Sequence, residues 1–263
     1  MRGARPPAVA GRFYPADPAE LARQVAGLLG AVDAGADSPA EAYVVPHAGY
    51  RFSGPVAASV YARLGQARRV VLIGPAHFVP LAGCAVPSTE AFATPLGKVP
   101  VDVEGCRRLA GTGLAVTDDR PHEPEHSLEV QLPFLQTVLG DGWTVLPVAV
   151  GLATVDDVAD VLDTATAEPA LVLCSTDLSH HLPDPLARQR DRRTAAAVLD
   201  LDPTRIAPRD ACGRHALAGL LGWARRRSLT PRLLDLRTSA DTAGTPDRVV
   251  GYGAFALGRA YRR

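Results

Sequence analysis

The chain has 263 residues and a mass of 27.6 kDa, which fits one large domain or two small ones and is enough to build a core without disulfides. Its 28 basic and 28 acidic side chains cancel, which argues against nucleic acids and membranes as partners, because both usually require a clustered positive surplus. Hydrophobic residues make up 47% of the chain and charged residues 21%, values that exclude a chain disordered throughout.

The predicted elements alternate between apolar runs of strand length and stretches with helical spacing. In chain order the pattern predicts a helix from Asp17–Pro18, a strand over 43–46, a helix over 54–64, a strand over 69–73, a helix over 125–139, a strand over 145–150, a helix over 154–163, a strand over 170–175, helices over 184–200 and 212–225, and strands over 231–237 and 249–257. This alternation indicates an α/β protein. No repeat or linker marks a boundary, so we expect a single domain over residues 1–263.

Two features favour a soluble, cytoplasmic protein. The uncharged stretch 70–87 contains three prolines and two glycines, so it predicts a strand, a loop and a strand rather than a membrane span. The N-terminal residues 1–7 lack the apolar core of a secretory signal. The four cysteines show no CxxC spacing, so neither a zinc ribbon nor a thioredoxin motif is predicted.

Histidines follow three of the predicted strands, at positions 47, 77 and 180. In open α/β sheets ligands bind outside the carboxyl ends of the strands, so His47, His77 and His180 are candidates for one shared crevice. Each histidine taken alone is better explained as a surface or hydrogen-bonded core group, but three in equivalent positions favour a shared site. We interpret the other histidines at 122, 181 and 215 as solvent-facing or supporting groups.

Cys212 stands where a helix is expected to begin. A helix N-terminus lowers the pKa of a thiol, so we expect a thiolate able to bind a metal, against the alternative of a packed cysteine. Cys84, Cys106 and Cys174 lie among apolar neighbours and are expected to be structural. Glu125 is explained by helix capping, and the pattern leaves open whether His126 points into the crevice or to water.

Six segments together carry a family resemblance: 5–15 (RPPAVAGRFYP), 45–54 (VPHAGYRFSG), 73–77 (IGPAH), 125–129 (EHSLE), 175–180 (STDLSH) and 212–214 (CGR). On these segments the sequence resembles the Memo family, also called AmmeMemoRadiSam system protein B. The resemblance implies a three-layer α/β/α sandwich around a mixed, largely parallel sheet, similar to the LigB-type class III extradiol dioxygenases. Those enzymes open catechol rings with non-haem Fe(II) held by two histidines and a carboxylate.

The resemblance also implies the site residues. His47, His77 and Cys212 correspond to the metal ligands, and His180, Asp177 and His126 to catalytic residues of the pocket. A cysteine therefore replaces the dioxygenase carboxylate, and a thiolate is softer, is itself oxidisable and suits copper or zinc as well as Fe(II). Fold similarity alone does not decide the reaction.

Three functions are compatible with these residues. The first is a non-haem iron-dependent, oxygenase-like redox activity on a small-molecule substrate. The second is non-catalytic binding of a metal or peptide, in concert with the AMMECR-type and radical-SAM partners that the system name implies. The third is a hydrolase with Cys212 as nucleophile, which would work without a metal.

Overall fold

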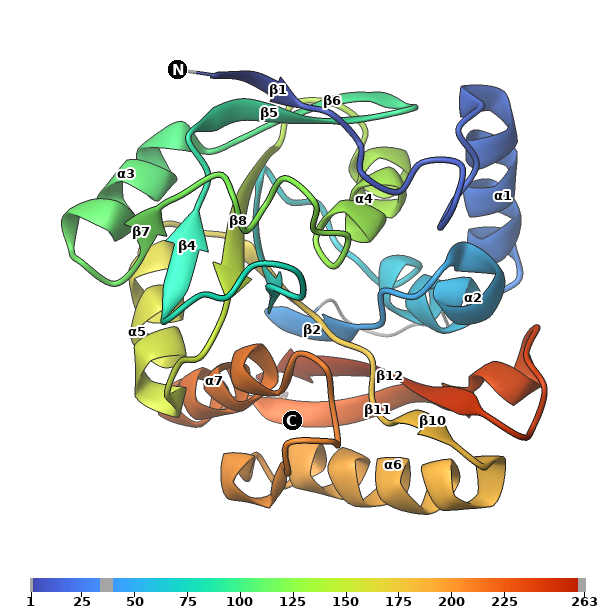
Figure 1. The fold of residues 1–263 in the computed structure, drawn as a ribbon. Helices are drawn as coiled ribbons and strands as arrows, with labels where there is room; N and C mark the ends of the chain where they lie inside the picture. Colours follow the sequence, from blue (N-terminus) through green and yellow to red (C-terminus); the bar gives the residue numbers. More distant parts are fainter. Residues whose placement is uncertain (1, 34–39, 260–263) are drawn as a thin grey trace.

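The centre of the fold is a mixed sheet of nine strands, seen in a computed structural model that describes residues 2–33 and 40–259 (Figure 1). Four parallel strands form its middle, in the order β2 (Ala42–Val45), β9 (Leu171–Ser175), β3 (Arg69–Pro75) and β8 (Thr144–Val150). Their side chains are almost all buried, as the continuous apolar runs predict for strands covered on both faces. The α/β prediction is therefore confirmed.

Shorter or antiparallel strands complete the sheet on both sides. They are β12 (Val249–Gly258), β11 (Thr230–Thr238) and β10 (His180–Leu182) beyond β2, and β4 (Cys84–Val86) and β7 (Val116–Thr117) beyond β8. Within the described residues four of the eight neighbouring pairs are antiparallel, so parallel pairing is less dominant than expected. A separate small sheet pairs β1 (Arg2–Arg5), β5 (Thr89–Thr94) and β6 (Gly97–Pro100), none of which was predicted.

The helices pack in two groups and one single helix (Figure 1). One group contains α1 (Pro18–Gly30), α2 (Tyr50–Tyr61) and α4 (Leu132–Leu139), which contact each other. The other contains α3 (Val103–Gly111), α5 (Val155–Ala165) and α7 (Arg214–Arg226). Helix α6 (Asp184–Leu199) packs against β11 and β12. Short 3-10 turns are η1 (Glu129–Gln131), η2 (Pro203–Arg205) and η3 (Ser239–Asp241).

Among the described residues, no helix combines the length and the apolar character that a membrane crossing requires.

Two helix boundaries differ from the prediction, and both differences shape the site. Helix α2 begins at Tyr50, where the Tyr50 N–H donates to the Phe13 carbonyl, and Pro55 lies within it. The expected helix 125–139 is instead a turn, then η1, then α4 from Leu132. Pro133 occupies the first turn of α4, where its missing N–H costs nothing, so the helix starts there rather than bending.

Candidate metal centre

Three neighbouring parallel strands deliver polar side chains to one edge of the sheet. His47 follows β2, Asp177 follows β9 and His77 follows β3, and β9 lies between the other two strands. Parallel neighbours end at the same edge, so residues 130 positions apart meet there. The Asp177 Oδ1 accepts a 2.7 Å hydrogen bond from the His47 backbone N–H. The loops that follow these three strands therefore lie at one edge of the sheet.

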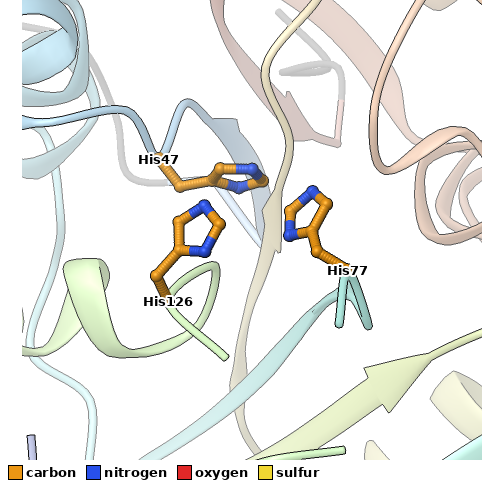
Figure 2. Close-up of side chains that lie close together, drawn as sticks. All are labelled: His47, His77 and His126. Carbon is orange, nitrogen blue, oxygen red and sulfur yellow. The ribbon is translucent and has the colours of Figure 1, made fainter. Parts of the chain in front are cut away.

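Three histidines form the core of the site (Figure 2). One ring nitrogen each of His47, His77 and His126 lies within 4.8 Å of the other two. His47 meets the other two rings edge-on, while His77 and His126 stack with centroids 4.8 Å apart. His126 therefore points into the crevice rather than to water, which the sequence had left open.

His77 is held by a carboxylate. The buried Glu125 accepts from the His77 backbone N–H through Oε2 at 2.5 Å and from the ring Nδ1 through Oε1 at 2.9 Å. Burial alone would raise the pKa of Glu125, but the hydrogen bonds and the charge of His77 outweigh it and lower the pKa to about 2. A carboxylate only accepts, so Nδ1 carries a hydrogen, and in the neutral form of the ring Nε2 keeps its lone pair. Glu125 thus orients His77, and it also accepts from the backbone N–H groups of His126 and Ser127, so it caps a turn instead of the predicted helix.

His47 and His126 are neutral around pH 7. Burial, with the nearby charges of His126 and His77, lowers the pKa of His47 well below its ordinary value. Burial likewise lowers the pKa of His126 to about 4. The neutral imidazole is the form that binds metals. The His126 Nδ1 is buried and makes no hydrogen bond among the described residues, although the Glu125 Oε1 lies 3.3 Å from it.

Cys212 contacts the cluster through His47. Its Sγ lies 3.2 Å from the His47 Nε2 and accepts from the Asp177 backbone N–H at 3.3 Å. Two ligands of one tetrahedral zinc-sized ion, with bonds near 2.1 and 2.3 Å, lie about 3.6 Å apart, so the pair fits one ion. The expectation of a thiolate is wrong for the metal-free protein: burial, reinforced by the Asp177 charge, raises the pKa of Cys212 to about 12. The helix-start argument fails because α7 begins only at Arg214, two residues after Cys212.

The predicted catalytic residues lie at different depths. Asp177 is buried, and that burial raises its pKa to about 7. His180 is exposed in β10, with its Nδ1 2.8 Å from the Leu178 carbonyl, so Nδ1 donates and Nε2 is left free. Its charge still contributes to the lowered pKa of His47.

The remaining histidines and cysteines lie outside the cluster. His122 is buried against the Ala85 carbonyl and not solvent-facing, because the Phe92 ring contacts its ring and Arg5 donates to its backbone carbonyl. His181 is exposed, and the His215 Nδ1 bonds to the Ala153 carbonyl. Cys84, Cys106 and Cys174 are buried free thiols, as predicted.

A second buried carboxylate, Glu129, ties the N-terminal segment to the site and was not predicted from the sequence. It accepts from Arg5 Nη1 at 2.6 Å, from the backbone N–H groups of Ala8 and Val9, and from the Tyr14 hydroxyl. Arg5 also donates to the carbonyl of Glu125. The only sequence signal was the two glutamates spaced four residues apart around His126.

The donor set fits a transition-metal ion. Neutral imidazoles suit iron, zinc and copper, and a thiol that ionises on binding favours the softer of these. The His47 Nε2 faces the Cys212 thiol, and the fold uses the Nδ1 of His77 for Glu125. Two ligand sets stay predictions. The resemblance implies His47, His77 and Cys212, and the geometry offers the three histidines.

Comparison with known proteins gives one consistent result. A protein-family model described as Memo-like protein matches residues 5–256. A MEMO1 family protein of Methanococcoides burtonii is 36% identical over 96% of this chain and 99% of its own length. MEMO1 family proteins of Methanopyrus kandleri (35% identical, 97% of this chain, 99% of its own) and Aeropyrum pernix (34%, 96% and 99%) are similar throughout as well.

Proposed function

Because the chain belongs to the Memo family, we propose that it binds a redox-active metal ion, Fe(II) in the first place, and carries out oxygenase-like redox chemistry at this site. The observation that supports the proposal is the convergence of three histidine ring nitrogens within 4.8 Å, with the Cys212 thiol against one of them. His47, His77 and His126 would hold the ion, and Cys212 would join as a fourth donor once it has lost its proton. Fe(II) held by these residues would supply the electrons for the redox chemistry.

The chain's own groups provide proton transfer. Asp177 has a pKa near 7 and lies beside the thiol, so it can take the proton that Cys212 gives up. His180 is exposed with a free Nε2 and is suited to exchange protons between the site and a small-molecule substrate.

The proposal extends to the architecture. The two helix groups on the mixed sheet support a three-layer α/β/α arrangement like that of the class III extradiol dioxygenases. The thiol in place of their carboxylate argues that the reaction differs from catechol ring cleavage, because a thiolate donates more electron density and is itself oxidisable.

The test is metal stoichiometry after anaerobic loading with Fe(II). Wild type should bind one ion, His47→Ala and His77→Ala should bind none, and His126→Ala should bind weakly. His181→Asn is the matched control, since His181 is an exposed histidine with φ 58°, a conformation that asparagine tolerates. Equal iron content in wild type and in both His47→Ala and His77→Ala would overturn the metal site.

Proton release during loading decides the role of Cys212. Histidines bind as neutral groups and release nothing, whereas a thiol ligand releases one proton for each ion. We expect one proton at pH 8 from wild type and none from Cys212→Ser, measured by calorimetry in buffers of different ionisation enthalpy. Oxygen consumption by the loaded protein then separates the redox activity from a purely binding role with AMMECR-type or radical-SAM partners.

A further inference from the structure

His47 hydrogen-bonds to a serine hydroxyl instead of a carboxylate. The His47 Nδ1 lies 2.8 Å from the Ser175 Oγ, and a hydroxyl can donate or accept. The side chain that supports the ring therefore does not by itself determine which nitrogen of His47 carries the hydrogen. The surrounding hydrogen bonds do determine it.

The hydroxyl hydrogen of Ser175 is already committed. The Ser175 Oγ lies 2.6 Å from the carbonyl of Ser127, which can only accept, so Ser175 donates there. The Ser175 Oγ also receives a 2.8 Å hydrogen bond from the Gln131 Nε2. Its remaining lone pair faces the His47 Nδ1.

The orientation of the Gln131 amide is fixed in turn. Its Nε2 donates to the carbonyl of Pro46 at 2.9 Å, an acceptor that would repel the amide oxygen. Its Oε1 lies 2.7 Å from the Tyr61 hydroxyl, which donates to it. Tyr61, Gln131, Ser127 and Ser175 have no exposed surface, so water cannot substitute for a partner or reverse a donor.

We propose that Ser175 and Gln131 are positioning residues that hold His47 in the tautomer protonated at Nδ1. Every hydrogen in the chain from Tyr61 through Gln131 to Ser175 has one permitted direction, and the last one requires His47 to donate. Free histidine prefers the opposite tautomer, protonated at Nε2. The network therefore directs the Nε2 lone pair toward Cys212, 3.2 Å away. The value of this for metal binding rests on the proposed function; the tautomer itself does not.

Nitrogen NMR of the metal-free, ¹⁵N-histidine-labelled protein at pH 8 tests the tautomer directly. The two ring nitrogens of each neutral histidine differ in chemical shift and in coupling to the ring protons, and the His47 signals are identified by their loss in His47→Asn. We expect His47 protonated at Nδ1 in wild type. A wild-type His47 protonated at Nε2 would overturn the proposal, even if the protein binds iron.

Two variants and one control assign the effect to the network. Ser175→Ala removes the acceptor, so His47 should shift to a mixture or to the Nε2-protonated form, with a fall in Fe(II) affinity of about tenfold. Gln131→Met removes one donor to Ser175 and should shift the tautomer in the same direction but less. Ser53→Ala removes another buried serine hydroxyl of the same region, bonded to the Ala48 carbonyl, and should leave the His47 signals unchanged.

The outcomes separate the two proposals. Nδ1 protonation in a wild-type protein that binds no metal would support the network and refute the proposed function. An unchanged His47 tautomer in both folded variants would refute the role of Ser175 and Gln131. If Ser175→Ala fails to fold, the wild-type spectrum and Gln131→Met still decide the question.

Discussion

Glu125 and Glu129 lie one helical turn apart in sequence, are both buried, and each accept four hydrogen bonds, yet they do different work. Glu125 accepts from His77 N and Nδ1 and from the backbone N–H groups of His126 and Ser127, so its partners belong to the metal site. Glu129 accepts from the guanidinium of Arg5, a permanent charge. Removing the charge of Glu129 would therefore leave the buried guanidinium of Arg5 without a counterion. Removing that of Glu125 would leave backbone N–H groups without their acceptor and the His77 ring without the group that orients it.

The largest expected effect is on stability, from Glu129→Gln. The variant leaves the Arg5 charge buried without a counterion, and it turns an amide group toward backbone donors. We expect the free energy of unfolding to fall by about 3–5 kcal/mol, measured by denaturant titration. Glu104→Gln, which breaks an exposed pair with Arg107, should change it by less than about 0.5 kcal/mol. Similar losses in the two variants would contradict the assignment.

Glu125→Gln should act on the metal more than on the fold. An amide can still accept from the His77 ring, but the charge that fixes the ring and makes it more basic is lost. We expect Fe(II) or Zn(II) affinity to fall about 10–100-fold in competition with a chelator. Unfolding should be destabilised by less than in Glu129→Gln. An unchanged metal affinity would show that Glu125 only shapes the turn.

The histidines and Glu125 should make the stability of the metal-free protein fall in acid over two pH ranges, and Asp177, whose pKa is raised to about 7, opposes part of the first fall. His122 and His126 have pKa values lowered to about 4. Between about pH 6.5 and 4 these two histidines are therefore protonated in the unfolded chain but not in the folded one, which lowers the free energy of unfolding as the pH falls. Each such group contributes a slope of up to about 1.4 kcal/mol per pH unit. The Glu125 contribution is lost next, as pH falls from its ordinary pKa of 4.5 toward 2.

Two variants resolve these steps. His122→Gln, which can still donate to the Ala85 carbonyl, should flatten the first step and leave the second. Glu125→Gln should remove part of the second. Denaturant titrations between about pH 8 and 3 provide the measurement, and a His122→Gln profile parallel to wild type throughout would contradict the prediction.

Arg5→Lys should have the smallest effect on the metal. Lysine keeps a charge opposite Glu129 but lacks the planar fork that also reaches the carbonyls of His122 and Glu125. Since the turn that carries His126 then loses two of its supports, we expect metal affinity to fall by less than about tenfold. A loss larger than that of Glu125→Gln would reverse the ranking of the two carboxylates.

The strand-end histidines were predictable because their signal is local. A buried parallel strand is visible as an uninterrupted apolar run. A histidine that follows such a strand lies at the ligand-binding edge of the sheet, and this position depends only on the strand before it. The family segments added Cys212, Asp177 and His126 to the same region. The boundaries of α2 and α4 were wrong because they depend on a bond to Phe13 and on a proline in the first turn.

The supporting network was not predictable for a different reason. Ser175 and Gln131 read as a strand end and a helix residue, and their roles arise only where β9 and η1 pack together. Cys212 was predicted as a thiolate because a helix start was assumed, and burial beside Asp177 reverses its pKa. Small strands such as β6 and β7 carry too few residues to show a period.

The strand order has a consequence for how the site arises in the cell. The strands that precede His47 and His77 do not pair with each other, because β9 lies between them. A ribosome that has synthesised the first 150 residues has made all three histidines, but not the strand that sets their spacing. Under the proposed function, metal capture has to wait until β9 and then Cys212 emerge, so a growing chain passes most of its synthesis without the complete site.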